Sequence, residues 1–212
     1  MHFALPEDLQ QFQQLARTFA QEYVAPRARK WDADKWIDDE LFVKAGELGL
    51  LGVYVPEEYG GCGQGLLAMA IITEELARHC GATALAITAH NGLGCGHIKL
   101  AGSKEQHQRW LPKLAKGPEL AAWCLTEPHC GSDAAALTTR AEKKNGGWVL
   151  NGQKLFITSA RRAAVLVVMA RTKPEGGKDG ISAFVVEKGT PGLILGEPED
   201  KLGCRGSDTV PV

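Results

Sequence analysis

The hydrophobic pattern of this chain changes period near its middle, so one repeating architecture cannot account for both halves. From residue 9 to about residue 116 apolar residues recur every three or four positions, whereas after Pro118 they alternate between Gly and Asn breaks. The Lys116-Gly117-Pro118 turn separates the two patterns. We therefore predict an all-helical domain over residues 1–117 and a β domain over residues 118–212.

The first half contains segments with a clear helical period, which must bury their apolar stripes against one another. Ser103 and Gln106 have the spacing of a capping box, in which each side chain satisfies a backbone donor of the other residue. The helices that we predict cover residues 9–23, 41–48, 66–76 and 103–115.

The second half carries strand signals. The Asn145-Gly146-Gly147 sequence is typical of a hairpin turn, because Asn and Gly tolerate positive φ angles. Segments of helical period that could connect parallel strands are absent from this half of the sequence, and closely joined antiparallel strands curl into a small barrel or sandwich. The fold class is therefore α+β multidomain, with an all-α domain followed by an antiparallel β-barrel or sandwich. The predicted strands cover residues 120–126, 138–143, 148–150, 154–158, 165–171, 181–187 and 193–195.

Composition excludes several classes of function. With 24 Lys and Arg against 25 Asp and Glu, the net charge is −1 and gives no field to hold a polyanion, so we expect no nucleic-acid partner. The longest apolar run, residues 163–170, is far shorter than the roughly 20 residues of a membrane span. The six cysteines and the acidic start, without a leader, indicate free thiols in a reducing compartment.

A first candidate site is the segment 123–133, which reads Trp-Cys-Leu-Thr-Glu-Pro-His-Cys-Gly-Ser-Asp at the end of a predicted strand. Gly131 lets the main chain approach a ligand closely, so backbone N–H groups and the Ser132 hydroxyl can bind a phosphate. An ordinary turn in which Thr126 and Ser132 cap backbone groups explains the same residues, and composition alone favours that turn.

A second candidate is the segment 151–159, a tight turn that leads into a predicted strand. Side chains two residues apart share a face of a strand, so Phe156 and Thr158 are expected to point the same way. An aromatic face beside a hydroxyl suits a flat heteroaromatic ring. Taken alone, this segment is better explained by ordinary sheet packing.

Together the two segments resemble the flavin signatures of the acyl-CoA dehydrogenase family. Residues 124–136 follow the first signature and residues 151–158 the second, while residues 201–209 look like a third. Residues 55–61 and 102–106 resemble the family's N-terminal domain. The resemblance covers essentially the whole chain, and it implies the N-terminal helical and middle β domains of the family without its C-terminal four-helix domain.

The resemblance implies that FAD is the cofactor and that the β domain binds flavin and thioester. The hydroxyl of Thr126 would hydrogen-bond the pyrimidine edge of the ring, and the Thr158 hydroxyl would bond N5. Ser132 would meet the FAD pyrophosphate together with Gly131, and would also meet the passing pantetheine arm of the substrate. The implied cofactor-binding residues are Trp123, Cys124, Leu125, Thr126, Gly131, Ser132, Phe156, Ile157 and Thr158.

Three positions depart from the family pattern. Cys130 replaces a smaller or amide residue, Phe156 stands where Trp is usual, and Ser159 stands where Asn is usual. Phenylalanine keeps a stacking face but lacks the indole N–H, so we expect weaker FAD binding or a shifted potential.

The reaction implied by the resemblance is α,β-dehydrogenation of an acyl-CoA thioester. A carboxylate removes the α-proton while the β-hydrogen leaves as hydride to flavin N5, which gives the trans-2-enoyl-CoA. The base is a Glu of the family's C-terminal domain, so we expect no catalytic residue among these 212 residues and no activity from them alone. Glu127 is assigned no base role.

The resemblance also implies partners and a location. We expect an electron-transferring flavoprotein as electron acceptor, a homodimer or homotetramer of the complete protein, and the bacterial cytoplasm or the mitochondrial matrix as its compartment. Two other readings stay open: a non-catalytic, truncated paralogue that binds flavin or a partner, and a flavin oxidase or monooxygenase on the same fold.

A metal site is not predicted. The candidate ligands lack the pairwise spacing of zinc fingers or ribbons. They are His90, Cys95, His97, His129 and Cys130.

Overall fold

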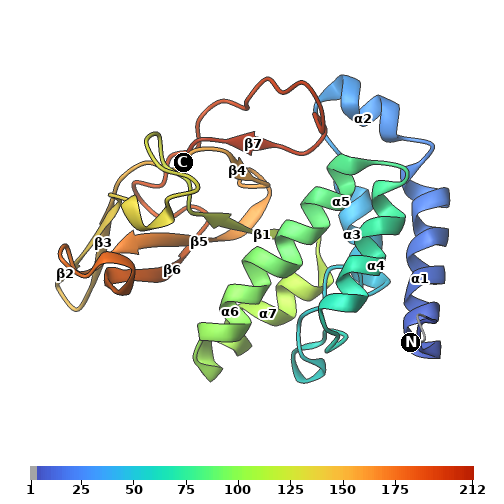
Figure 1. Ribbon diagram of the computed structural model, residues 1–212, viewed down its shortest axis with the longest axis horizontal. Coiled ribbons are helices and arrows are strands. Elements are labelled where there is room, and N and C mark those ends of the chain that lie inside the picture. The colour runs from blue at the N-terminus through green and yellow to red at the C-terminus, as the bar shows by residue number, and fades with distance from the viewer. Residues whose placement is uncertain (1–3) are drawn as a thin grey trace.

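The computed structural model describes residues 4–212, so the first three residues of the predicted 1–117 domain lie outside it. Helices form one half of the molecule and a sheet with long loops forms the other, with α5 and α6 lying next to the sheet (Figure 1). The helical elements are α1 (Glu7–Phe19), the π-helical η1 (Ala20–Val24), α2 (Ala28–Asp34), α3 (Asp39–Glu47), the 3-10 turn η2 (Glu57–Tyr59), α4 (Leu66–Ala77), α5 (Gly81–Thr88), the π-helical η3 (Ala89–Cys95), α6 (Gly96–Ala101) and α7 (Lys104–Lys116).

The predicted helices are confirmed, because α1, α3, α4 and α7 occupy the expected segments. Acidic residues in the first turn of α1 favour its start, since they complement the positive end of the helix dipole. The capping box of α7 is formed: the Ser103 N–H donates to Gln106 Oε1 at 2.8 Å, and the Gln106 N–H donates to Ser103 Oγ at 3.3 Å.

One long helical run, α5–η3–α6, is not predicted by the sequence pattern. This run is apolar nearly all round and is interrupted by Gly92, Gly94 and Gly96, so it shows no stripe. Its middle section packs against the first strand of the sheet. The close approach requires Gly94, because a Cβ there would lie 2.4 Å from the Cβ of Ala121.

The strands form one mixed sheet and one two-stranded ladder. In the larger sheet the order is β1-β5-β2-β3, and β6 pairs with β5, while β4 pairs with β7 separately. The turn at Asn145-Gly146 joins β2 to β3 with φ angles of 52° and 78°, as the sequence predicts. The predicted strand over residues 193–195 is wrong, since that segment is irregular. The bounds are β1 (Leu120–Cys124), β2 (Arg140–Lys144), β3 (Gly147–Asn151), β4 (Ile157–Thr158), β5 (Ala163–Arg171), β6 (Ile181–Glu187) and β7 (Thr209–Val210).

The predicted antiparallel barrel or sandwich is wrong in its pairing and its closure. β5 runs parallel to β1 and antiparallel to β6, and the sheet is open. A parallel pair needs a crossover of a dozen or more residues, for which the sequence analysis considered only helices. Here residues 125–162 make the crossover with the β2–β3 hairpin and loops.

The two halves share a hydrophobic core, which places the candidate segments at a rigid junction. A cluster of buried residues from the helical half, including Cys95, Trp110 and Leu111, continues into Ala121 and Val165 of the sheet. The cysteines are all free thiols, as predicted. Among residues 4–212, none of the helices has the length and apolar character needed to cross a lipid bilayer.

Candidate functional site

The two candidate segments meet at the end of β1. The Leu155 N–H donates to the Thr126 carbonyl at 2.8 Å, and the Lys154 ammonium donates to the Leu125 carbonyl at 3.0 Å. β1 also contacts β4, which carries Thr158. The fold therefore brings together two stretches that lie about thirty residues apart in the sequence.

Behind this junction lies a buried ion pair. The Lys154 Nζ and Glu127 Oε1 atoms are 2.8 Å apart, and both side chains are almost fully buried. The Glu127 carboxylate also accepts hydrogen bonds from the Thr138 N–H at 2.6 Å, the Thr138 hydroxyl at 2.9 Å and the Thr139 N–H at 3.0 Å. Burial alone would raise the pKa of Glu127, but these donors outweigh it and lower the pKa to about 2. Glu127 is thus a saturated structural anion, which agrees with its having no role as a base.

The loop after Glu127 presents unpaired backbone donors. Glu127 and Cys130 close a tight turn, in which the Glu127 N–H donates to the Cys130 carbonyl at 2.8 Å. The next N–H groups, of Gly131, Ser132 and Asp133, donate to no acceptor within residues 4–212. Successive free N–H groups in a turn form a concavity that binds anions. A Cβ on Gly131 would meet nothing closer than 3.8 Å, so the approach to this loop is open.

Several side chains at the junction also lack partners. The indole N–H of Trp123 is buried without an acceptor, and its ring stacks on His97 with centroids 5.1 Å apart. A buried unpaired donor is costly, so this group is suited to a ligand acceptor. The hydroxyls of Thr126 and Thr158 make no hydrogen bond within the described part of the chain. The junction is therefore rich in free donors.

The structure corrects the expectation that residues 154–158 alternate along one strand. β4 contains only Ile157 and Thr158, and Phe156 precedes it with a φ angle of 59° and with 59% of its surface exposed. Period-two spacing therefore does not decide which way Phe156 points. The side chains of Cys124 and Ile157 lie in the hydrophobic core, so these two residues can offer a ligand only their backbone atoms.

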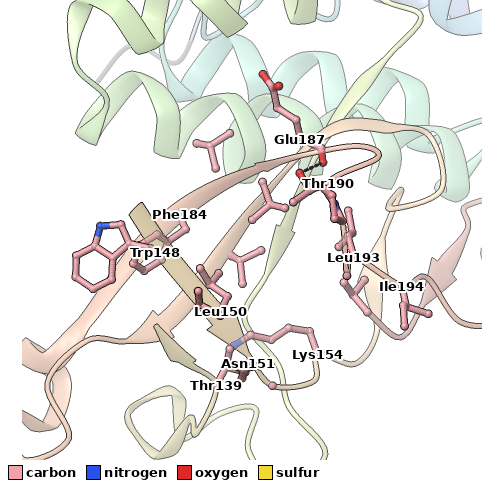
Figure 2. A pocket seen from close by; sticks show the side chains of 18 of the residues that line it. Thr139, Trp148, Leu150, Asn151, Lys154, Phe184, Glu187, Thr190, Leu193 and Ile194 are labelled. Carbon is pink, nitrogen blue, oxygen red and sulfur yellow. Dashed lines mark hydrogen bonds between the residues drawn. The ribbon is translucent and has the colours of Figure 1, made fainter. Parts of the chain in front are cut away.

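A large hollow lies apart from the predicted cofactor residues. It has a volume of about 860 Å³ and lies between β3, β6 and the segment 190–194 (Figure 2). Its walls are mostly apolar and include Trp148, Phe184 and Leu193. None of the nine predicted cofactor residues lines it. Asn151, Gly152 and Lys154 of the second candidate segment do line it, and Lys154 also reaches the junction. Sequence reasoning missed this hollow because its walls come from distant segments.

The five possible metal ligands considered from the sequence do not gather in one place, because His129 and Cys130 lie apart from His90 and Cys95. Glu127, His129 and Cys130 offer ligand atoms within 4.8 Å of one another, but a cation there would compete with the Lys154 ammonium for Glu127. His90 and Cys95 belong to the core of the helical half, with Cys95 Sγ 3.6 Å from His90 Nε2. We assign no metal to either group.

Family models identify both halves of the chain. The model for the N-terminal domain of acyl-CoA dehydrogenase matches residues 6–118, and the model for the middle domain matches residues 122–212. The chain belongs to the acyl-CoA dehydrogenase family. The open mixed sheet is thus the middle domain of this family, and the helices form its N-terminal domain.

Relatives of known sequence and structure agree. Human mitochondrial short-chain specific acyl-CoA dehydrogenase is 44% identical over 97% of this chain and 50% of its own length. Butyryl-CoA dehydrogenase from Megasphaera elsdenii superimposes with a TM-score of 0.93 at 36% identity, over 100% of this chain and 56% of that one. An acyl-CoA dehydrogenase from Bacillus anthracis, solved in complex with FAD, superimposes with a TM-score of 0.87 at 37% identity. The match covers 98% of this chain and 36% of that one. The chain spans about half the length of the curated relatives it matches.

Proposed function

We propose that the whole protein is an FAD-dependent dehydrogenase that converts an acyl-CoA thioester to its trans-2-enoyl-CoA. The observation that carries this proposal is the contact between the two flavin-signature segments, made by the Leu155 N–H and the Thr126 carbonyl. It brings the Trp123 indole, the Thr158 strand and the free N–H groups after Cys130 into one region.

The residues present fit FAD. Its pyrophosphate requires donors, and the N–H groups of Gly131 and Ser132 are free to supply them. Its ring requires an aromatic or apolar flank and donors at its edges, for which we assign Phe156, Leu125, and the Trp123 and Thr126 donors. The Thr158 hydroxyl would donate to N5, and the backbone atoms of Cys124 and Ile157 would complete the set. When bound, FAD supplies the hydride acceptor.

The substrate side of the site is assigned by family resemblance. The Ser132 hydroxyl would also contact the pantetheine arm of the acyl-CoA. We place the general base, a glutamate, in the C-terminal domain that the family resemblance implies, because Glu127 is ionised and fully hydrogen-bonded. Reoxidation by an electron-transferring flavoprotein, a homodimeric or homotetrameric assembly, and a bacterial cytoplasmic or mitochondrial matrix location complete the proposal.

The test uses the full-length protein, purified and reconstituted with FAD. We expect flavin absorbance bands, and anaerobic addition of a panel of acyl-CoAs should bleach them with formation of the trans-2-enoyl-CoA, detected by mass spectrometry. Protein that retains no flavin after reconstitution would refute the proposal. Bound flavin that no acyl-CoA reduces would favour the non-catalytic module, and rapid peroxide release in air would favour an oxidase.

A further inference from the structure

One buried ammonium group holds both neighbours of Thr126. The Lys154 side chain is 3% exposed, and its Nζ donates to the carbonyl of Leu125 at 3.0 Å and to the carboxylate of Glu127 at 2.8 Å. Leu125 and Glu127 flank Thr126 in the chain. Because Lys154 binds the residues on both sides of Thr126, a movement of the Thr126 backbone would strain or break one of these hydrogen bonds.

The backbone of the same segment is fixed as well. The Lys154 N–H donates to the Val212 carbonyl at 2.7 Å, and the Val212 N–H donates to the Lys154 carbonyl at 2.8 Å. The Leu155 N–H donates to the Thr126 carbonyl. Four residues further on, Thr158 pairs with Thr209 in the β4–β7 ladder. Lys154 therefore lies at the start of the short stretch that ends at Thr158.

The pair is also anchored to the central sheet. Glu127 binds the N–H groups of Thr138 and Thr139, and the Thr139 carbonyl accepts from the Arg171 N–H at the end of β5 at 2.7 Å. The cross-link thus ties the Thr126 loop and the Thr158 stretch to the rigid middle of the sheet.

We propose that Lys154, through its bonds to Leu125 and Glu127, is a positioning residue that sets the separation of the Thr126 and Thr158 hydroxyls and thereby the alignment of the bound flavin ring. The inference rests on the proposed function, since it concerns the same site. Ion pairs buried this deeply are weak contributors to stability, because desolvation opposes the attraction, whereas a loss of alignment at a reacting centre is expensive in rate.

The decisive variant is Lys154→Met in the full-length holoenzyme. Methionine preserves the apolar stem and removes the three ammonium donors. We expect FAD to remain bound, but with an altered visible spectrum and midpoint potential, and with flavin reduction by acyl-CoA slower by on the order of 10- to 100-fold at saturating substrate. The KM should change little, because the substrate contacts are not removed.

A second variant separates positioning from stability. Lys154→Met leaves Glu127 buried without its cation, which destabilises the fold, whereas the double variant Lys154→Met/Glu127→Gln removes both charges. We expect the double variant to be more stable than Lys154→Met, because it leaves no unpaired charge buried, while the slow reduction and the altered spectrum persist. A double variant that recovers the unfolding stability and also the wild-type reduction rate and spectrum would overturn the positioning role.

The matched control is Glu75→Gln, which removes the buried carboxylate of an ion pair whose guanidinium partner is half-exposed. Glu75 accepts from Arg17 at 2.8 Å between α1 and α4 and contacts none of the flavin segments. The Glu75→Gln substitution should lower the unfolding stability without changing the flavin spectrum, midpoint potential or reduction rate. A wild-type spectrum, potential and rate in both Lys154 variants would overturn the inference. Failure of the wild-type protein itself to bind FAD would instead overturn the proposed function.

Discussion

Within the flavin segments, burial separates side chains that can act on a cofactor from those that cannot. Burial raises the pKa of the Cys124 thiol to about 12, so this residue stays neutral and unreactive. Glu127 is ionised and has its oxygens occupied by donors. The Thr158 hydroxyl, in contrast, is partly exposed and free to donate to a bound ring.

At the scale of a residue, Thr158→Ala in the full-length protein should slow flavin reduction more than it weakens FAD binding. A single hydrogen bond to N5 matters most when charge builds there in the transition state, so a loss of roughly 10- to 100-fold is expected. Anaerobic stopped-flow measurement of flavin bleaching gives the rate, and titration gives the affinity. Thr158→Ser keeps a hydroxyl and should retain most of the rate. A weaker acyl-CoA affinity with an unchanged reduction rate in Thr158→Ala would contradict the assignment.

At the scale of an element, amphipathic helices were predictable and the rest depended on packing. α1 and α7 show their buried faces in the spacing of their apolar residues, and the turn at Asn145 is encoded locally. The α5–η3–α6 run has no polar face to reveal its period. The pairing of β1 with β5 forms across residues 125–162, so no local pattern encodes it.

The candidate site, too, was predicted from the sequence only in part. Motifs identified the two segments, but the Lys154 cross-link was missed, because a lysine in a strand signature gives no sequence sign of burial. The left-handed backbone at Phe156 and Ser159 was missed too, since neither residue type favours it.

The close packing of η3 on β1 predicts a difference between two neighbouring glycines. Gly94→Ala places a Cβ 2.4 Å from the Cβ of Ala121, so it should destabilise the protein by about 1–3 kcal/mol. Gly92→Ala is the control, because a Cβ there meets nothing within 4 Å and alanine favours helix by up to about 1 kcal/mol. Urea unfolding of both variants measures the difference. Equal midpoints would show that the helix can move away from the strand.

At the scale of the whole molecule, polar contacts join the two domains around their shared core. The Arg162 guanidinium, just before β5, lies 3.6 Å from the ring centroid of Trp36 and donates to Asp39 and to the Ile37 carbonyl. On the other side Glu187 of β6 accepts from Trp110 at 2.6 Å and from Arg109 at 3.0 Å. A third contact is made by His90, which lies fully buried between the Leu51 carbonyl and β1.

His90 should make the stability of this junction sensitive to acid. Its Nδ1 accepts from the Ala121 N–H at 2.9 Å, so Nε2 carries the proton and donates to the Leu51 carbonyl at 3.0 Å. Burial lowers the pKa of His90 from 6.5 to about 4 in the folded protein. Between these values the unfolded chain binds more protons, so the contribution of His90 is complete above pH 6.5 and declines as the pH falls towards 4.

The expected loss from His90 is about 2 kcal/mol of unfolding free energy between pH 7.5 and pH 5. Urea unfolding at a series of pH values, followed by tryptophan fluorescence, measures it. His90→Gln is the matched variant, because an amide oxygen can still accept from the Ala121 N–H but does not titrate. Its stability should be lower at pH 7.5 and should change less on acidification. Burial raises the pKa of Asp208, which gives a pH dependence of the opposite sign that both proteins share, so the difference between them isolates His90. The same dependence of stability on pH in both proteins would contradict the lowered pKa of His90 in the folded protein.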